Sequence, residues 1–185
     1  MYIFFRKLLV AFLLQCISGQ PMAQSYLTRT GFIGFYSKTT LEDIQAENNQ
    51  VYAALDPANH RIAFAALLKG FIFPRQLMQD HFNENYVESD KFPKVTFSGT
   101  CLGELNLNQQ AIYQVVIKGI LSLHGVNKAL ETTAQIEVKP EKVSGSAVFK
   151  LRPEDFQISI PGVVRDKIAR EINVTVHIDW TTVKQ

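Results

Sequence analysis

Cysteine is scarce in this sequence. The chain has only Cys16 and Cys101 among its 185 residues. If the first lies in a segment removed on export, one thiol remains and no internal disulfide can form. A hydrophobic core must then hold the fold together, and a chain of this length buries about 70% of the surface that its unfolded form exposes. We expect one domain, residues 24–185.

Charge is also limited. Charged residues make up 19% of the chain and the formal net charge is +2. Arg6 and Lys7 supply this surplus, so basic and acidic residues balance from Gln24 onward. Nucleic-acid binding relies on clustered Lys and Arg that displace counterions from phosphates. The balanced body therefore argues against a nucleic-acid partner.

Spacings typical of nucleotide, metal and catalytic sites are missing. Gly31 and Gly34 lack the third glycine and the following helix of a phosphate loop, and the histidines lie at least 21 residues apart. Asp80 and His81 are adjacent, but consecutive helical residues point about 100° apart, so we expect them to anchor a helix to nearby loops. Cys101 continues an apolar strand face, which predicts a buried, unreactive thiol. We expect no metal, no cofactor and no catalytic residue.

Residues 1–23 have the order of a secretory signal peptide. A cationic start precedes ten residues of mainly apolar type, which are too few for a membrane span of about 20. A polar tail of small residues follows. We place the cleavage between Ala23 and Gln24, with a cut after Gly19 as the alternative. Lipid attachment at Cys16 is disfavoured by the bulky Gln15 before it, and we expect a periplasmic or secreted protein.

Alternating apolar and polar residues dominate the rest of the chain. The pattern is clearest at Ile172, Val174, Val176, Ile178 and Trp180, because every residue between them is polar. A period of two places the apolar set on one face of a strand and the polar set on the other. The same alternation recurs at residues 62–68, 95–99, 134–138 and 143–151. Short turn-forming segments separate these strands and favour antiparallel neighbours.

One helix is expected among the strands, over residues 75–86. Leu77, Met78, Phe82 and Tyr86 are spaced so that they share one stripe. Many short strands with a single helix predict an antiparallel barrel or sandwich.

A barrel of about eight strands either fills itself with side chains or holds one apolar ligand. Small residues on inward faces, namely Ala66, Gly99, Gly145 and Ala147, indicate room inside. Composition alone nevertheless favours a filled core.

Three segments carry a family resemblance. Residues 77–97 read LMQDHFNENYVESDKFPKVTF, residues 119–128 read GILSLHGVNK, and residues 151–158 read LRPEDFQI. In order and spacing they resemble the YceI-like family of exported lipid-binding proteins. The second segment predicts a tight hairpin at His124-Gly125, where glycine adopts a positive φ. Gln157 departs from the family, which usually has glycine after the Asp-Phe pair, and this affects the local turn only.

The resemblance implies an all-β fold, a lipocalin-like antiparallel barrel of eight strands with the helix covering one end. It also implies an apolar channel, which in some relatives holds a polyisoprenoid chain. We therefore interpret the protein as an exported binding protein that carries or sequesters a long apolar lipid of isoprenoid type. Arg152 is expected to pair with Asp155 or to meet the head group of the lipid. The expected ligand-binding residues are Phe64, Leu68, Phe71, Met78, Phe82, Phe97, Ile117, Phe149, Phe156 and Arg152.

Two alternatives stay open at this point. A packed, ligand-free barrel could act through its outer surface in envelope stress or assembly. An enzyme could use Asp80 and His81. Transient contact with a membrane and a homodimer are further partner hypotheses that the sequence does not decide.

Overall fold

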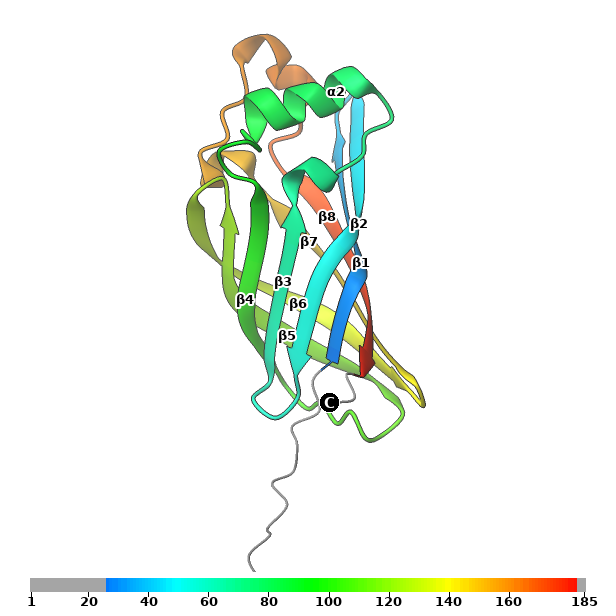
Figure 1. Ribbon diagram of the computed structural model, residues 1–185. Coiled ribbons are helices and arrows are strands. Elements are labelled where there is room, and N and C mark those ends of the chain that lie inside the picture. Colours follow the sequence, from blue (N-terminus) through cyan, green and yellow to red (C-terminus); the bar gives the residue numbers. More distant parts are fainter. Residues whose placement is uncertain (1–25, 183–185) are drawn as a thin grey trace, which may run out of the picture.

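The computed structural model describes residues 26–182, which form eight antiparallel strands closed into a barrel (Figure 1). The strands are β1 (Tyr26–Lys38), β2 (Asp43–Asp56), β3 (Arg61–Leu67), β4 (Lys94–Leu102), β5 (Ala111–Leu123), β6 (Val126–Lys139), β7 (Lys142–Leu151) and β8 (Ile172–Thr182). Each strand pairs with its neighbours in sequence, and β8 pairs with β1 to close the barrel. The predicted eight-stranded antiparallel barrel is confirmed. The predicted signal peptide lies outside the described residues.

The two long connections lie at the same end of the barrel (Figure 1, top). Between β3 and β4 lie the 3-10 turn η1 (Leu68–Gly70), the helix α2 (Gln76–His81) and the π-helical turn η2 (Phe82–Tyr86). Between β7 and β8 lie the 3-10 turns η3 (Pro153–Phe156) and η4 (Gly162–Lys167). We call this the capped end.

The predicted helix is present as α2 followed by η2. Met78, Phe82 and Tyr86 pack against the core, as the stripe predicts. Leu77 is 65% exposed and does not belong to the buried core. It nevertheless lines the same cavity at the capped end as Met78, Phe82 and Tyr86, so the four residues of the predicted stripe face one space.

Strand alternation separates the interior of the barrel from its outer surface. On β8, Val174, Ile178 and Trp180 are buried, while Asn173 and Thr175 are exposed. A period of two therefore predicted which face of this strand points inward.

Two of the four small inward residues are glycines with large or backbone groups close by. A Cβ at Gly145 would lie 2.7 Å from Cζ3 of Trp180, and one at Gly99 would lie 2.4 Å from the carbonyl oxygen of Lys118 and 2.7 Å from Cζ of Phe97. Ala66, Gly145 and Ala147 line a cavity inside the barrel, as the predicted room requires, whereas Gly99 does not. At Gly99 the missing side chain gives the neighbouring ring and strand a place to pack.

Three non-glycine residues at the capped end, Glu88, His124 and Gln157, adopt left-handed conformations. His124 and Gly125 have φ of 51° and 75°, which is the two-residue hairpin with positive φ at both positions. Gln157 has φ 57° and ends η3, and its N–H donates to the carbonyl of Glu154 at 3.1 Å. The turn usually built with glycine is therefore kept with Gln157.

Candidate ligand-binding site

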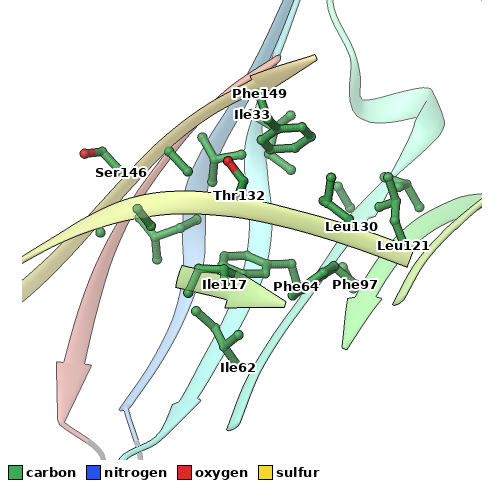
Figure 2. Close-up of a pocket in the computed structure, with 18 of the residues that line it drawn as sticks. Ile33, Ile62, Phe64, Phe97, Ile117, Leu121, Leu130, Thr132, Ser146 and Phe149 are labelled. Atoms are coloured by element: carbon green, nitrogen blue, oxygen red, sulfur yellow. The ribbon is translucent and has the colours of Figure 1, made fainter. Parts of the chain in front are cut away.

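The barrel encloses an apolar inner cavity of about 90 Å³. Phe64 from β3, Phe97 from β4, Ile117 from β5 and Phe149 from β7 line it, and Figure 2 shows these side chains facing a common space. Trp180, which is 2% exposed, also lines this cavity. Alternation on four strands thus brings together apolar groups from distant parts of the sequence.

A middle cavity of about 150 Å³ adjoins the inner one. The two share the lining residues Ile33, Val95, Leu121 and Phe149. Apolar side chains from η1, η2 and η3 complete the middle cavity, so the two long connections cover the space that the strands leave open.

The outer chamber, of about 370 Å³, lies at the capped end. It shares Phe35, Phe82 and Ile172 with the middle cavity, and α2 and η4 contribute Met78 and Lys167 to its lining. Small-molecule sites usually measure about 300 to 1,000 Å³ and are mostly apolar with a few polar groups. The outer chamber fits this description, and the shared residues make the three cavities consecutive along the barrel.

Four phenylalanine rings separate the outer chamber from the middle cavity. Phe35, Phe71, Phe73 and Phe82 lie with ring centroids 5.1 to 5.8 Å apart. Tilted and edge-on contacts at these distances are the favourable geometry for aromatic pairs. This phenylalanine neck connects β1, the η1 region and η2, so it joins the capping connection to the barrel wall.

All ten residues expected to contact the ligand line one of the three cavities. The inner cavity has Phe64, Phe97, Ile117 and Phe149, the middle one has Leu68, Phe71, Phe82, Phe149, Arg152 and Phe156, and the outer chamber has Met78 and Phe82. The structure therefore places them together along one path. Their contact with a ligand stays a prediction.

Sequence reasoning missed Ile33 and Phe35 of β1 and the apolar residues of η4. Residues 32–36 are almost continuously apolar or aromatic, so alternation does not separate the two faces of β1. Irregular pairing of β1 with β2 around Gly31 also interrupts the register. The apolar side chains of residues 158–168 could have indicated that this segment lines a cavity.

Arg152 pairs with Glu171 rather than with Asp155. Its Nε and Nη2 donate to Oε1 of Glu171 at 3.2 and 2.9 Å. This hydrogen bond raises the pKa of Arg152 and lowers that of Glu171. The pairing with Asp155 was wrong, because the long connection brings Glu171 back beside Arg152 and a carboxylate can accept two N–H groups.

Asp80, His81 and Cys101, the other residues singled out for chemistry, lie in three different surroundings. Oδ1 of Asp80 accepts a hydrogen bond from Nε2 of Gln76 at 2.7 Å, and His81 lines the outer chamber. Neither side chain bonds to a loop within residues 26–182, so the anchoring role was wrong. Cys101 is buried, and burial raises the pKa of its thiol to about 11.

Two further findings concern the described part of the chain only. Within residues 26–182, no three His, Cys, Asp or Glu side chains come together where they could hold a metal ion. In the same stretch, no helix has the length and hydropathy needed to span a membrane.

A closed up-and-down barrel with apolar cavities in its interior is the architecture of lipocalin-like barrels. Within that class, the chain belongs to the YceI-like family, because the family model of the YceI-like domain matches residues 26–180.

Solved structures agree on the fold. A polyisoprenoid-binding domain from Saccharophagus degradans, implicated in plant cell wall breakdown, is 12% identical with a TM-score of 0.73, covering 86% of this chain and 98% of its own. Burkholderia cenocepacia BcnA is 11% identical with a TM-score of 0.68, over 80% and 95% of the two chains. The Campylobacter jejuni YceI protein is 17% identical with a TM-score of 0.57, over 74% and 81%. No curated protein is a significant sequence match.

Proposed function

We propose that this protein is an exported, non-catalytic binding protein that carries or sequesters a long apolar lipid of isoprenoid type in the barrel. The observation that carries the proposal is the row of three cavities, which share lining residues from the capped end inward. Membership of the YceI-like family and the likeness to a polyisoprenoid-binding domain support the same role.

Hydrophobic transfer gives such a site enough affinity without strong polar contacts. Each methylene removed from water contributes about 0.8 kcal/mol. The inner cavity is lined by apolar side chains with a few small hydroxyl groups, and no charged residue lines it. A long hydrocarbon chain therefore gains free energy along its whole length, and the shape of the channel selects the ligand. The proposal includes transient contact of the protein with a membrane, through which the lipid is released to an acceptor.

The alternative of a packed barrel acting through its surface predicts a filled interior. Aromatic rings do fill the space beside Gly99 and Gly145, but the three cavities favour a ligand. An enzyme using Asp80 and His81 is disfavoured because the carboxylate of Asp80 is engaged by Gln76.

The deciding experiment is to express the full chain with its own export signal and purify the exported protein. Any bound lipid is then extracted with organic solvent and identified by mass spectrometry. We expect the extract to contain a long-chain lipid of isoprenoid type in a stoichiometric ratio to the protein. Empty extracts from several hosts, together with no uptake of added lipid, would favour the surface-acting alternative.

A further inference from the structure

The pairing between β6 and β7 stops partway along the barrel wall. Residues 134–139 of β6 pair with residues 142–147 of β7, whereas β5 and β6 are paired along almost their whole length. Nearer the capped end, residues 126–133 and 148–151 of the same two strands are not paired with one another. We call this break in the wall the β6–β7 window.

Burial of the inward side chains changes where the pairing ends. Ala134 and Ile136 of β6 lie in the paired part and are buried, while Leu130 and Thr132 on the same face are only half-buried. Phe149 of β7 is also half-buried, and Figure 2 shows Thr132 and Phe149 on ribbons that run apart. All five residues line the inner cavity. The lining of this cavity is therefore accessible to solvent at the window and not beside the paired part of β6.

The seam between β2 and β3 is also paired over only part of its length, but other contacts close it. Nδ2 of Asn48 donates to the carbonyl of Leu67 at 3.0 Å, and the backbones of Glu47 and Ile72 exchange two hydrogen bonds. Within residues 26–182, no bond of either kind crosses the β6–β7 window. The window is thus a break in the wall that the rest of the described chain does not seal.

Widening the window breaks no hydrogen bond of the described chain. Its unpaired backbone groups lie at the surface, where water satisfies them. Opening a paired seam would break a row of backbone hydrogen bonds, each of which stabilises the fold. Opening the capped end would separate the rings of the phenylalanine neck and release His124 from Glu88 and Phe156. The window is therefore the route into the inner cavity that costs the least free energy.

Unpaired strand edges also attract further strands from other chains, but the edges of the window are protected. Lys128, Glu131 and Lys150 belong to the unpaired segments and are exposed. Charged side chains on a strand edge disfavour the addition of another strand. The window is therefore suited to a ligand that passes through it rather than to a peptide that pairs with it.

We propose that the β6–β7 window is the entry site for the ligand, through which an apolar chain reaches the inner and middle cavities while the cap stays closed. Phe149 lines both cavities and does not belong to the phenylalanine neck. Its half-buried ring is the side chain that an entering chain displaces. This inference rests on the proposed lipid-binding function and adds the route by which the lipid is loaded.

An entry site controls the rates of binding rather than the affinity. The dissociation constant depends only on the free and bound states, so closing the route slows association and dissociation by the same factor. Removing a contact that holds the ligand would instead speed dissociation and weaken the affinity. Measuring both rates therefore distinguishes an entry site from a binding wall.

The window is closed by a chemical bridge in the variant Glu131→Cys/Lys150→Cys, and the matched control is Glu131→Cys/Lys118→Cys. Lys118 is paired with Glu131 across β5 and β6, so the control bridge joins strands that are already hydrogen-bonded. All three replaced side chains are exposed, and each variant loses one lysine. The shortest cleavable bismaleimide that joins each pair is added to the folded full chain in a Cys16→Ser background, where Cys101 is buried. Peptide mass spectrometry confirms each bridge.

The probe is farnesol, a neutral isoprenoid alcohol, mixed with lipid-free protein by stopped flow. Trp180 is the single tryptophan of the chain and lines the inner cavity, so its fluorescence reports the arrival of the probe. We expect the window bridge to slow association and dissociation at least tenfold each and to leave the dissociation constant within twofold. The control bridge should leave all three within twofold of wild type, and cleavage of the window bridge should restore both rates.

The outcomes separate this inference from the proposed function. Association that is unchanged by the window bridge, or slowed equally by both bridges, would overturn the entry site and leave lipid binding intact. A window bridge that weakens the affinity tenfold without slowing dissociation would make the window part of the binding wall, and would also overturn the entry site. If wild-type protein does not bind farnesol, the proposed function fails and this inference fails with it.

Discussion

Nε2 of His124 lies 2.8 Å from Oε2 of Glu88, and its Nδ1 lies 3.0 Å from the carbonyl oxygen of Phe156. The imidazole thereby links the β5–β6 hairpin to both long connections of the capped end. The ring of Phe92 packs edge-on against it with centroids 4.6 Å apart. Because the side chain of His124 is only 10% exposed, these contacts hold the cap to the barrel rim with little competition from water.

Replacing His124 by asparagine is expected to loosen the cap. Asparagine tolerates the left-handed backbone at this position but is too short to reach both acceptors, so we expect a loss of about 1 to 3 kcal/mol of stability, measured by urea unfolding. His60→Asn is the control, because His60 has the same φ of 51° and is exposed. It should change stability by less than about 0.5 kcal/mol. Equal effects would contradict the role of the His124 side chain.

A charge placed in the inner cavity should abolish lipid uptake. Phe149→Asp puts an unpaired carboxylate among apolar side chains that line the inner and middle cavities, where it cannot be compensated. Val148→Asp is the control, since the neighbouring side chain is 64% exposed on the outer face. Uptake is measured by extraction and mass spectrometry after incubation with lipid. If Phe149→Asp folds and takes up lipid like wild type, Phe149 does not belong to the binding path.

An uncharged plug tests the same path without burying a carboxylate. Ala147 lines the inner cavity, and Ala147→Phe should occupy much of its 90 Å³ at a cost of about 1 to 3 kcal/mol in stability. We expect a folded protein with reduced lipid uptake. Val148→Phe should fold and take up lipid normally, because it adds the same ring to the exterior. Normal uptake by both variants would place the ligand outside the inner cavity.

Gln157→Gly should stabilise the protein. The left-handed conformation costs a residue with a Cβ about 1 to 2 kcal/mol, and the greater backbone entropy of unfolded glycine removes roughly half of that gain. We therefore expect a net gain of up to about 1 kcal/mol, measured by chemical denaturation. Gln114→Gly in β5, where the residue is exposed on a regular strand, should instead cost about 0.5 to 1 kcal/mol.

Cys101 is expected to resist thiol reagents in the native protein. Burial raises the pKa of its thiol to about 11, so very little thiolate exists at pH 8, and only the thiolate reacts. In a Cys16→Ser background, labelling of the native protein should be slow at pH 8, and labelling in urea should match that of a free cysteine. Equally fast labelling in both states would show that this strand opens readily.

Acid should remove the stabilising effect of Glu171. Hydrogen bonds from Arg152 and Lys150 lower its folded pKa below the usual 4.5. Stability from this carboxylate is therefore present above pH 4.5 and is lost as the pH falls through the lowered folded pKa. Urea midpoints of wild type and Glu171→Gln should differ at pH 7 and converge at low pH. Glu104→Gln, which changes an exposed residue, should show no such convergence, and a constant gap for Glu171→Gln would contradict this account.

Local sequence patterns predicted most of the fold. On β8 the alternation from Ile172 to Trp180 separated the buried face from the wet one, because side-chain direction in a strand follows from a period of two. The stripe of Met78, Phe82 and Tyr86 located the helix for the corresponding reason. Alternation also selected Phe64, Phe97 and Phe149 of the inner cavity, since inward-facing large side chains in a barrel surround its axis.

Contacts between segments that are far apart in the sequence could not be predicted from the sequence. Glu171 replaced Asp155 as the partner of Arg152, because the return of the β7–β8 connection decides which carboxylate comes within reach. Lys167 lines the outer chamber because η4 lies over the capped end, and no local sequence pattern indicates that position.

The sequence by itself determined the antiparallel strands and which of their faces are apolar, because hydrophobic periodicity is a local property of the chain. Closure into eight strands was implied by the family resemblance, and the structure confirms it. Only the tertiary structure decided that rings fill the space beside Gly99 and Gly145 while three cavities stay open. Packing depends on the contacts between side chains of different strands. Strand register and the two long connections determine these contacts, and no single segment does.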